Sequence, residues 1–372
     1  MEAMPNEMQF RPSERALLRA DATEPLSDKS RCIRVSTPAD GPAIVALLRN
    51  AGLHPIWQER GLHWKYWQKR ADWPGDRSFV LSDGSQILGH VAIVPGACTW
   101  GHQRAAVVHM IDWAASADAP GAGVALMKHV RSLADAMIAT DGSPDTLRVL
   151  PVLGFRRYGT ATLYVRALHP LRYLTFSAPW NWKTLPKFLI SVAWGLAAPA
   201  VQCGQWNTRR IMPEQVQSIA AILPSAGANR VVMERSTALF TYLLDCPIAT
   251  VTLHSVEKAG HIRGYFLLAF VPGQARLVDC WIDSSEPDDW QALVQCAVHV
   301  ARQAPGIAEV ITVASDPLLS GCLRQSGFHA RRKTPVQMLI RKGQDGPPEC
   351  PPVQMLDSDA AYHHHGYPQF WG

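Results

Sequence analysis

The sequence lacks several features that would place it in a common protein class. Its 8 cysteines are scattered and include no Cys-x-x-Cys pair, which argues against a structural metal site. No basic run is interleaved with aromatic residues, and the formal net charge of +5 is too small to indicate nucleic-acid binding. The polar N-terminus is not a signal peptide. We expect a cytoplasmic protein with free thiols, no metal and no nucleic-acid partner.

A long apolar run is also missing. The apolar stretch 188–201 is shorter than the ~20 residues that a membrane-spanning helix needs, and Gly195 and Pro199 weaken it further. Two interpretations of the segment 185–201 remain. It is either a helix buried between two domains or an interfacial helix whose tryptophans and lysines lie at a bilayer surface. The second would make the protein peripherally membrane-associated.

What the sequence does contain is enough apolar material for two domains. The chain has 372 residues, with 47% hydrophobic and 18% charged, as in a globular protein with a substantial core. Its most informative stretch is 107–128, where an apolar run ends in a loop of small residues that opens into a helical pattern. Gly121 and Gly123 allow a tight turn and close approach of a ligand. The free amides at the start of such a helix favour a phosphate or pyrophosphate.

This loop is neither a P-loop nor a complete dinucleotide fingerprint. It resembles the pyrophosphate loop of the GNAT superfamily of N-acyltransferases, whose motif is Gln/Arg-x-x-Gly-x-Gly/Ala. Residues 120–125 read Pro-Gly-Ala-Gly-Val-Ala, so Gly123 and Ala125 match while Pro120 departs from the motif. The resemblance implies acetyl-CoA as co-substrate. The residues that it implies for cofactor binding are Ala115, Gly121, Ala122, Gly123, Val124 and Ala125. The alternative is a strand-to-helix turn without a ligand.

The order of elements extends the resemblance over residues 31–168. Residues 33–48 predict a strand, a turn and an amphipathic helix, and residues 78–94 predict a β-hairpin. In this superfamily the hairpin precedes the central strand and the cofactor loop. Leu153-Gly-Phe155 resembles the family's terminal Leu-Gly-Phe motif.

An internal repeat divides the chain. Gly89 and Gly264 precede similar apolar strands, and Gly154 and Gly327 precede a phenylalanine, each pair being separated by roughly 175 residues. We therefore predict an α/β (α+β) fold of two GNAT-like mixed-sheet domains in tandem. The predicted segments are a flexible N-terminal segment 1–30, a GNAT domain 31–168, a linker with an apolar helix 169–228, a degenerate GNAT-like domain 229–342 and a C-terminal tail 343–372. Chance similarity between two α/β halves is the alternative.

The second copy lacks the glycine loop. Residues 282–290 place four carboxylates where a pyrophosphate would bind, and like charges repel. We expect this copy to shape the acceptor side.

In the tail, Tyr362 precedes three consecutive histidines, 363–365, which cannot all face one metal ion. A solvated tail or a tail docked on the second domain is the interpretation.

The central strand offers two candidates for the general base that an amine acceptor requires. His109 is the first choice, because an unperturbed histidine titrates near neutrality, and Asp112 is the second. The alternatives are a hydrogen-bonded core histidine and an aspartate bonded to a loop amide near Ser116. The family's usual tyrosine acid is replaced by Leu150, which leaves Tyr158 as the nearest candidate acid.

The resemblance to the GNAT superfamily implies an N-acyltransferase that moves an acetyl or other acyl group from acyl-CoA to a primary amine. The tandem layout resembles bacterial GNAT proteins of polysaccharide-related contexts, with Trp64-Lys-Tyr-Trp67 and Cys246-Pro247 as shared features. That resemblance implies an amino sugar of a polysaccharide precursor as acceptor. Two alternatives remain, an inactive GNAT-fold binding protein and a peptidoglycan-type aminoacyl transferase.

Overall fold

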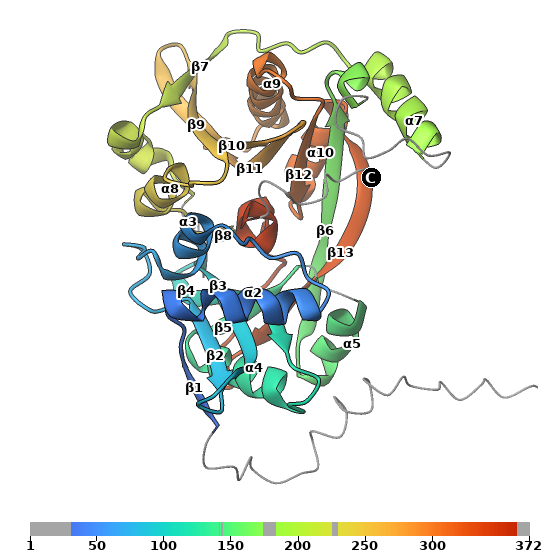
Figure 1. The fold of residues 1–372 in the computed structure, drawn as a ribbon. Helices are drawn as coiled ribbons and strands as arrows, with labels where there is room; N and C mark the ends of the chain where they lie inside the picture. The colour runs from blue at the N-terminus through green and yellow to red at the C-terminus, as the bar shows by residue number, and fades with distance from the viewer. Residues whose placement is uncertain (1–30, 141, 143, 174–183, 225–229, 363–372) are drawn as a thin grey trace, which may run out of the picture.

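The computed structural model describes residues 31–140, 142, 144–173, 184–224 and 230–362. The predicted flexible segment 1–30 and the three histidines 363–365 lie outside the described residues. Every strand belongs to one mixed sheet, whose order is β1-β2-β3-β4-β5-β13-β6-β12-β11-β10-β9-β7, with β8 (Val231–Met233) paired to β3. Figure 1 shows this sheet running through both lobes of the molecule.

The two halves repeat the same order of elements. The first half contains β1 (Cys32–Val35), α2 (Gly41–Asn50), α3 (Glu59–Leu62), β2 (Ser78–Ser82), β3 (Ile87–Trp100), β4 (Gln103–Ala115), α4 (Ala122–Ser132), β5 (Ala136–Ala139), α5 (Pro144–Val152) and β6 (Arg156–Ala167). The second contains β7 (Trp206–Ile211), the 3₁₀ segment η5 (Pro213–Ile222), α8 (Thr237–Leu244), β9 (Thr250–Lys258), β10 (His261–Val271), β11 (Gln274–Ile282), α9 (Pro287–Gln303), β12 (Glu309–Ala314), α10 (Pro317–Gln325) and β13 (His329–Ile340). The predicted hairpin and central strands are confirmed.

The halves exchange their last strands. β6 ends the first half but pairs with β12 of the second, whereas β13 ends the second half and pairs with β5 of the first. The two exchanged strands also pair with each other, from His329 opposite Val165 to Met338 opposite Arg156. Backbone hydrogen bonds therefore run without interruption from one half to the other.

Local chemistry explains where several elements begin and turn. Asp316 and Ser236 accept hydrogen bonds from the amides of Leu319 and Leu239 and so cap α10 and α8. At Gly264, an added Cβ would lie 2.5 Å from the carbonyl oxygen of Trp281, so the close approach of β10 and β11 requires glycine.

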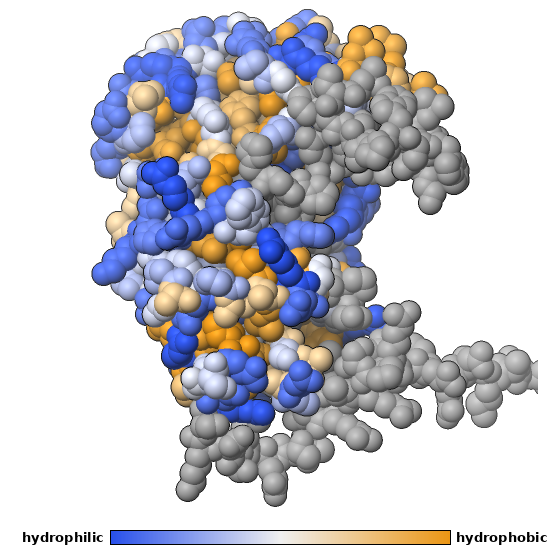
Figure 2. All heavy atoms as spheres, viewed as in Figure 1, coloured by the Kyte–Doolittle hydropathy of each residue, from blue (hydrophilic) through white to orange (hydrophobic). Residues whose placement is uncertain are grey.

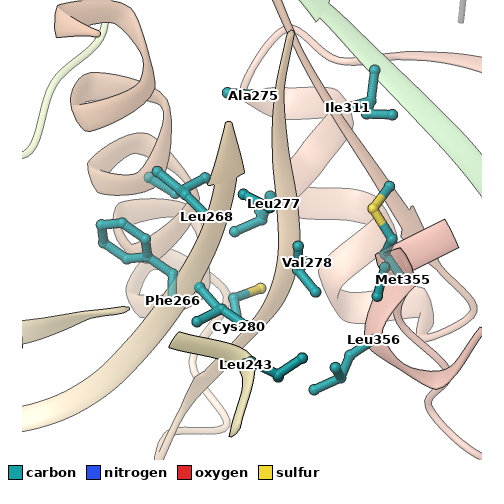
Figure 3. Packing of buried hydrophobic residues seen from close by; sticks show 14 of the residues in the cluster. Leu243, Phe266, Leu268, Ala275, Leu277, Val278, Cys280, Ile311, Met355 and Leu356 are labelled. Carbon is teal, nitrogen blue, oxygen red and sulfur yellow. The ribbon is translucent and has the colours of Figure 1, made fainter. Parts of the chain in front are cut away.

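The largest apolar core extends through both halves. It includes Ile44 and Leu48 of α2 and a dense cluster around β10 and β11. Figure 3 shows Leu277, Val278 and Ile311 of that cluster beside Met355 and Leu356 of the C-terminal segment. The segment forms the short 3₁₀ turns η6 (Met355–Asp357) and η7 (Asp359–Tyr362), which are largely buried. Residues 351–362 of the predicted tail are therefore largely buried against the core, whereas most of residues 343–349 are exposed.

The apolar helix of the predicted linker is α7 (Thr184–Ala197). It lies at the outer side of β6 rather than between the two lobes (Figure 1). Its Trp194 stacks on His329 at 3.9 Å between ring centroids, whereas Leu189, Ile190 and Leu196 are exposed. Figure 2 shows apolar surface at the upper end of this helix. Among the described helices, none combines the length and the apolar character needed to cross a membrane.

Candidate active site

The central strand β4 contains a β-bulge at Asp112. Opposite β3, the partners shift from Ala92–Ile111 to His90–Ala114, so β4 carries one extra residue. Asp112 adopts the left-handed conformation with φ 48°, which aspartate tolerates better than most residues. The bulge lies between His109 and the predicted cofactor loop and bends the strand at this point.

Two side chains from a short π-helix hold the bulge in place. The π-helix spans His63–Trp67, directly after α3, and such turns often occur at functional sites. Lys65 Nζ lies 2.6 Å from Asp112 Oδ2, and the Tyr66 hydroxyl donates to the same oxygen at 2.7 Å. Burial would raise the pKa of Asp112, but the Lys65 charge and the two hydrogen bonds outweigh it, so the pKa is lowered. An ion-paired carboxylate of low pKa is a poor general base.

His90 completes the support of the bulge from β3. Its Nδ1 is 2.9 Å from the Asp112 carbonyl oxygen, and its Nε2 is 2.9 Å from Ser78 Oγ. Because a carbonyl can only accept, Nδ1 must carry the proton. Burial lowers the pKa of His90 to about 4, so the ring is neutral near pH 7.

His109 lies where β4 and β5 diverge. The parallel pairs run from Val107–Ala136 to His109–Ile138, and beyond that point the described residues that pair with β4 all belong to β3. His109 Nδ1 is 2.9 Å from the Ile138 carbonyl oxygen. The same donor argument places a proton on Nδ1, so Nε2 is the ring nitrogen that can act as a base.

The predicted cofactor loop joins β4 to α4. Gly121 adopts φ 82° and precedes Ala122, the first residue of α4. The Gly121 carbonyl accepts the first helical hydrogen bond, from the amide of Ala125, so the amides of Gly123 and Val124 belong to the unpaired first turn. The Trp113 indole donates to the Gly123 carbonyl at 3.0 Å and packs against this glycine. The loop geometry fits an anionic group at the helix N-terminus.

The other predicted loop residues have packing roles as well. Ala115 pairs with Gly89 at the end of β4, and Ala122 is buried against the same region of β3. The loop and His109 thus lie at the two ends of the unpaired edge of β4, at most about 20 Å apart, because the bulge at Asp112 shortens the strand.

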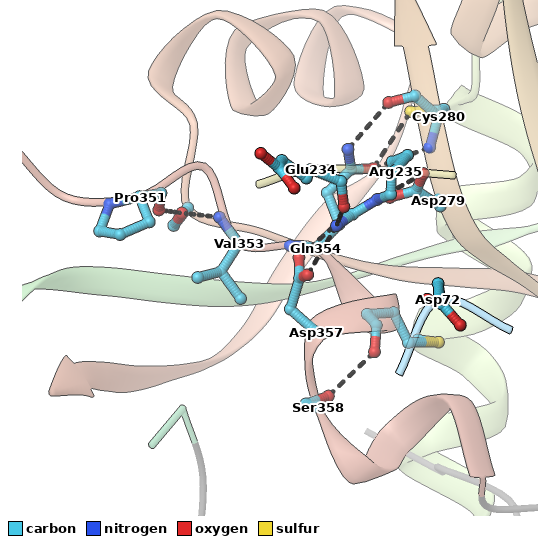
Figure 4. A network of polar contacts seen from close by, with 12 residues as sticks. Asp72, Glu234, Arg235, Asp279, Cys280, Pro351, Val353, Gln354, Asp357 and Ser358 are labelled. Carbon is cyan, nitrogen blue, oxygen red and sulfur yellow. Dashed lines mark hydrogen bonds and ion pairs between the residues drawn. The ribbon is translucent and has the colours of Figure 1, made fainter. Parts of the chain in front are cut away.

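The corresponding edge of the second half is filled by the chain itself. β11 and β12 pair from Gln274–Glu309 to Arg276–Ile311 and then diverge. Gln354 enters this gap, where its Oε1 accepts from the Cys280 amide at 3.0 Å and its Nε2 donates to the Cys280 carbonyl at 2.8 Å. Figure 4 shows this side chain bonded to both backbone groups.

The loop after β11 also differs chemically from the loop after β4. α9 begins at Pro287, which has no amide to donate, and Asp288 and Asp289 follow in the first turn. Ser284 Oγ donates to Asp289 Oδ2 at 2.8 Å, so part of the loop is already internally bonded. An anionic cofactor fits the first half and not the second.

A cavity of about 270 Å³ lies between the two halves next to His109. Its walls include β3, β4 and β5 of the first half and the segment that contains Arg235 of the second. Arg235 is buried and pairs with Asp279 and Asp357 at 2.7 and 2.8 Å (Figure 4). Burial opposes the charge of Arg235, but the two carboxylates raise its pKa well above the ordinary value.

Two further charged pairs line the cavity. Arg70 donates from Nε and Nη2 to both oxygens of Asp72, at 3.0 and 2.6 Å. Arg104 and Glu234 pair at 2.9 Å and are more exposed. With Arg235 and Asp357 the lining holds three arginines and three carboxylates, so their formal charges balance.

The structure does not bring Tyr158 to this cavity. Tyr158 lies near the start of β6 and packs against the cluster around Val336 and Ile340. The tyrosine that does line the cavity is Tyr362, which is 1% exposed. Sequence reasoning missed Tyr362 and Arg70, because neither stands in a motif and the fold alone brings them to His109. Within the described residues, no three His, Cys, Asp or Glu side chains gather as a metal site.

No protein-family profile matches the sequence, and no curated protein matches it. Solved structures do. A tandem GNAT protein from the clavulanic acid biosynthesis pathway is 12% identical, with a TM-score of 0.52 over 85% of this chain and 100% of that chain. Saccharomyces cerevisiae N-myristoyltransferase, solved with myristoyl-CoA, is 11% identical with a TM-score of 0.56 over 86% and 80%. A GCN5-related N-acetyltransferase from Anabaena variabilis is 12% identical with a TM-score of 0.52 over 83% and 72%. The chain has the tandem GNAT fold.

Proposed function

We propose that this chain is an N-acyltransferase that moves an acetyl or other acyl group from acyl-CoA to a primary amine. The observation that carries the proposal is the difference between the two halves. In the first, the edge of β4 is unpaired beyond His109 and leads to a glycine-containing helix N-terminus. In the second, Gln354 fills the equivalent edge and Pro287 opens an acidic helix. Only the first half therefore suits the cofactor.

In this proposal the cofactor-binding residues are those of the loop and its flanks. The amides of Gly123 and Val124 face the pyrophosphate, and Gly121 supplies the turn that exposes them. The methyl side chains of Ala115, Ala122 and Ala125 are small and so leave room for the pyrophosphate. Pro120 adds no side-chain contact, so affinity rests on backbone donors.

His109 is the proposed general base. Acyl-CoA supplies a thioester carbonyl that is activated for attack. The Nε2 lone pair of His109 removes a proton from the acceptor amine as its nitrogen bonds to the acyl carbon and the carbon–sulfur bond breaks. The leaving thiolate takes its proton from solvent, since Tyr158 lies elsewhere. We propose a positioning role for Asp112, which fixes the bulge through Lys65 and Tyr66.

Calorimetry of acetyl-CoA binding tests the cofactor site. We expect the wild-type chain to bind, and we expect Gly123→Trp to abolish binding, because its side chain would displace Trp113 and cover the loop amides. The matched control is Gly321→Trp in α10, where an added Cβ meets no atom within 4 Å. Absence of wild-type binding at millimolar acetyl-CoA would refute the proposal and favour a binding protein that has lost the cofactor.

The acceptor is a narrower question. An amino sugar of a polysaccharide precursor is a primary amine of the proposed class, and its support is the sequence resemblance alone. A profile of acceptor amines with acetyl-CoA separates it from other amines, and the use of aminoacyl-tRNA would favour the peptidoglycan-type alternative.

A further inference from the structure

The cavity beside His109 contains polar side chains that the protein leaves incompletely bonded. Arg70 is 4% exposed, and its Nη1 has no hydrogen-bond partner among the described residues. The Tyr362 hydroxyl, on a side chain that is 1% exposed, also has none within that part of the chain. Buried polar atoms are nearly always hydrogen-bonded in folded proteins, and a buried guanidinium nitrogen without a partner is especially unfavourable. Such atoms call for a hydrogen-bond partner from outside the protein.

These two groups come from distant parts of the chain but lie close together. Arg70 stacks over the ring of Tyr242, with its guanidinium carbon 5.4 Å from the centroid. Trp64 stacks on Tyr242 at 5.0 Å and contacts Tyr362 at 5.3 Å between centroids. The aromatic cluster therefore holds both donors in the lining of the cavity that also includes His109.

The chemistry of the unbonded atoms selects the ligand group. Arg70 Nη1 can only donate, and the indole Nε1 of Trp73, which also lines the cavity, is a second donor without a partner among the described residues. The Tyr362 hydroxyl donates as well. The lining carboxylates already accept from arginines. The cavity thus presents free donors and occupied acceptors, which complements a carboxylate more closely than a hydroxyl, because a hydroxyl brings a donor of its own.

We propose that the acceptor of this enzyme is a small amine that carries a carboxylate, of the amino-acid class, and that Arg70 and Tyr362 bind its carboxylate while its amine faces His109. The inference rests on the proposed acyl transfer, because it takes this cavity as the acceptor side. Arg70 and Tyr362 are specificity-determining residues in this account. The Arg70–Asp72 pair remains intact, since Nη1 is the one guanidinium nitrogen that Asp72 does not use.

Equilibrium binding tests the inference independently of turnover. The twenty α-amino acids and their α-amides are titrated into the full chain by calorimetry, with and without saturating CoA. Each pair has the same amine and side chain and differs only in the carboxylate. We expect at least one amino acid to bind roughly 10- to 100-fold more tightly than its amide, as for a hydrogen bond to a charged group. Arg70→Gln should remove this difference by weakening the acid and leaving the amide unchanged.

Three variants make the result interpretable. Arg70→Lys keeps the charge beside Asp72 but removes the free Nη1 donor, so it should fold and still lose most of the preference for the acid. Tyr362→Phe removes only the hydroxyl and should lower the preference by a smaller factor. Arg34→Gln is the matched control, because Arg34 forms an exposed pair with Asp40 at the far edge of the sheet.

Equal binding of acid and amide, tighter binding of neutral glucosamine, or an acid preference that survives Arg70→Gln would overturn the inference. If acetyl-CoA fails to bind, the proposed function is wrong, and the acid-to-amide ratio measured without cofactor still decides whether the cavity recognises a carboxylate. If acetyl-CoA binds but the chain has equal affinity for each amino acid and its amide, only the carboxylate assignment fails.

Discussion

The ion pair between Lys65 and Asp112 should be one of the most sensitive points of the fold. The Lys65 side chain is 2% exposed and that of Asp112 is 13% exposed, with 2.6 Å between Nζ and Oδ2. Lys65→Met removes the cation and leaves a largely buried carboxylate with the Tyr66 hydroxyl as its remaining side-chain partner. Breaking a buried pair in this way costs about 3–5 kcal/mol. We expect that loss in the free energy of unfolding at pH 7.

Guanidinium unfolding followed by tryptophan fluorescence measures this effect, and a double-mutant cycle isolates the pair. Asp112→Asn should destabilise the chain by a similar amount, while the Lys65→Met/Asp112→Asn double variant should lose much less than the sum. Arg34→Met, which breaks an exposed pair with Asp40, is the control and should change stability by less than about 1 kcal/mol.

The pH dependence gives an independent check with a defined sign. The pKa of Asp112 is lowered in the folded chain, so its contribution is present above the unfolded value of about 3.9 and disappears as pH falls through the folded pKa. Without Lys65 the buried carboxyl should have a raised pKa, so the penalty of Lys65→Met should shrink at acid pH. A penalty below about 1 kcal/mol, or no coupling in the cycle, would refute the assignment of Lys65 and Asp112 as a structural pair.

Three further results are expected. His109→Gln should lower kcat about 10²- to 10⁴-fold, as for loss of a general base, while calorimetry shows unchanged acetyl-CoA affinity; an unchanged kcat would exclude His109 as the base. Gly264→Ala should destabilise the chain by about 1–3 kcal/mol in guanidinium unfolding, because its Cβ would collide with the Trp281 carbonyl; a neutral effect would contradict the close strand contact. Burial lowers the pKa values of His90 and His254 to about 4. Between pH 6.5 and about 4 the unfolded chain therefore binds more protons than the folded chain, so the free energy of unfolding should decrease as the pH is lowered through this range. The double His→Gln variant should flatten this slope, and an unchanged slope would assign it to other groups.

The elements of each half could be predicted from local sequence. Strands β2 and β3, the helix α4 and the repeated glycines at positions 89 and 264 follow from apolar periodicity, turn residues and spacing. The exchange of β6 and β13 could not be predicted in this way. Both strands have the same pattern whether they close their own half or the other, and the choice depends on long-range pairing that no local signal encodes.

The candidate site likewise contains residues that local sequence predicts and residues that only the long-range fold brings together. The loop around Gly121 and the base candidate His109 stand in a motif or on a recognisable strand. Arg70 and Tyr362 do not, because their proposed roles depend on an aromatic cluster that joins residues far apart in the chain. The prolines and histidines of the C-terminal segment suggest a loop that is solvated or docked on the second domain, and the contacts of Gln354 with β11 agree with docking. Met355 of this segment and its neighbouring residues are core residues.

Asp112 illustrates how burial alters a plausible assignment. Its place on the central strand suggests a base, and sequence cannot show that Lys65 and Tyr66 approach it from a π-helix some 46 residues earlier. Those partners lower the pKa of the carboxyl and fix the backbone, which favours support of the bulge over proton transfer.

The most direct test of the central claim is hydrogen–deuterium exchange of the full chain with and without acetyl-CoA. We predict new protection of backbone amides in residues 110–126, which include the unpaired edge of β4 and the start of α4. The equivalent residues 277–291 should not change, because Gln354 already bonds the Cys280 amide and the acidic loop repels the cofactor. Protection of residues 277–291, or of neither segment at saturating acetyl-CoA, would contradict the assignment of the cofactor to the first half.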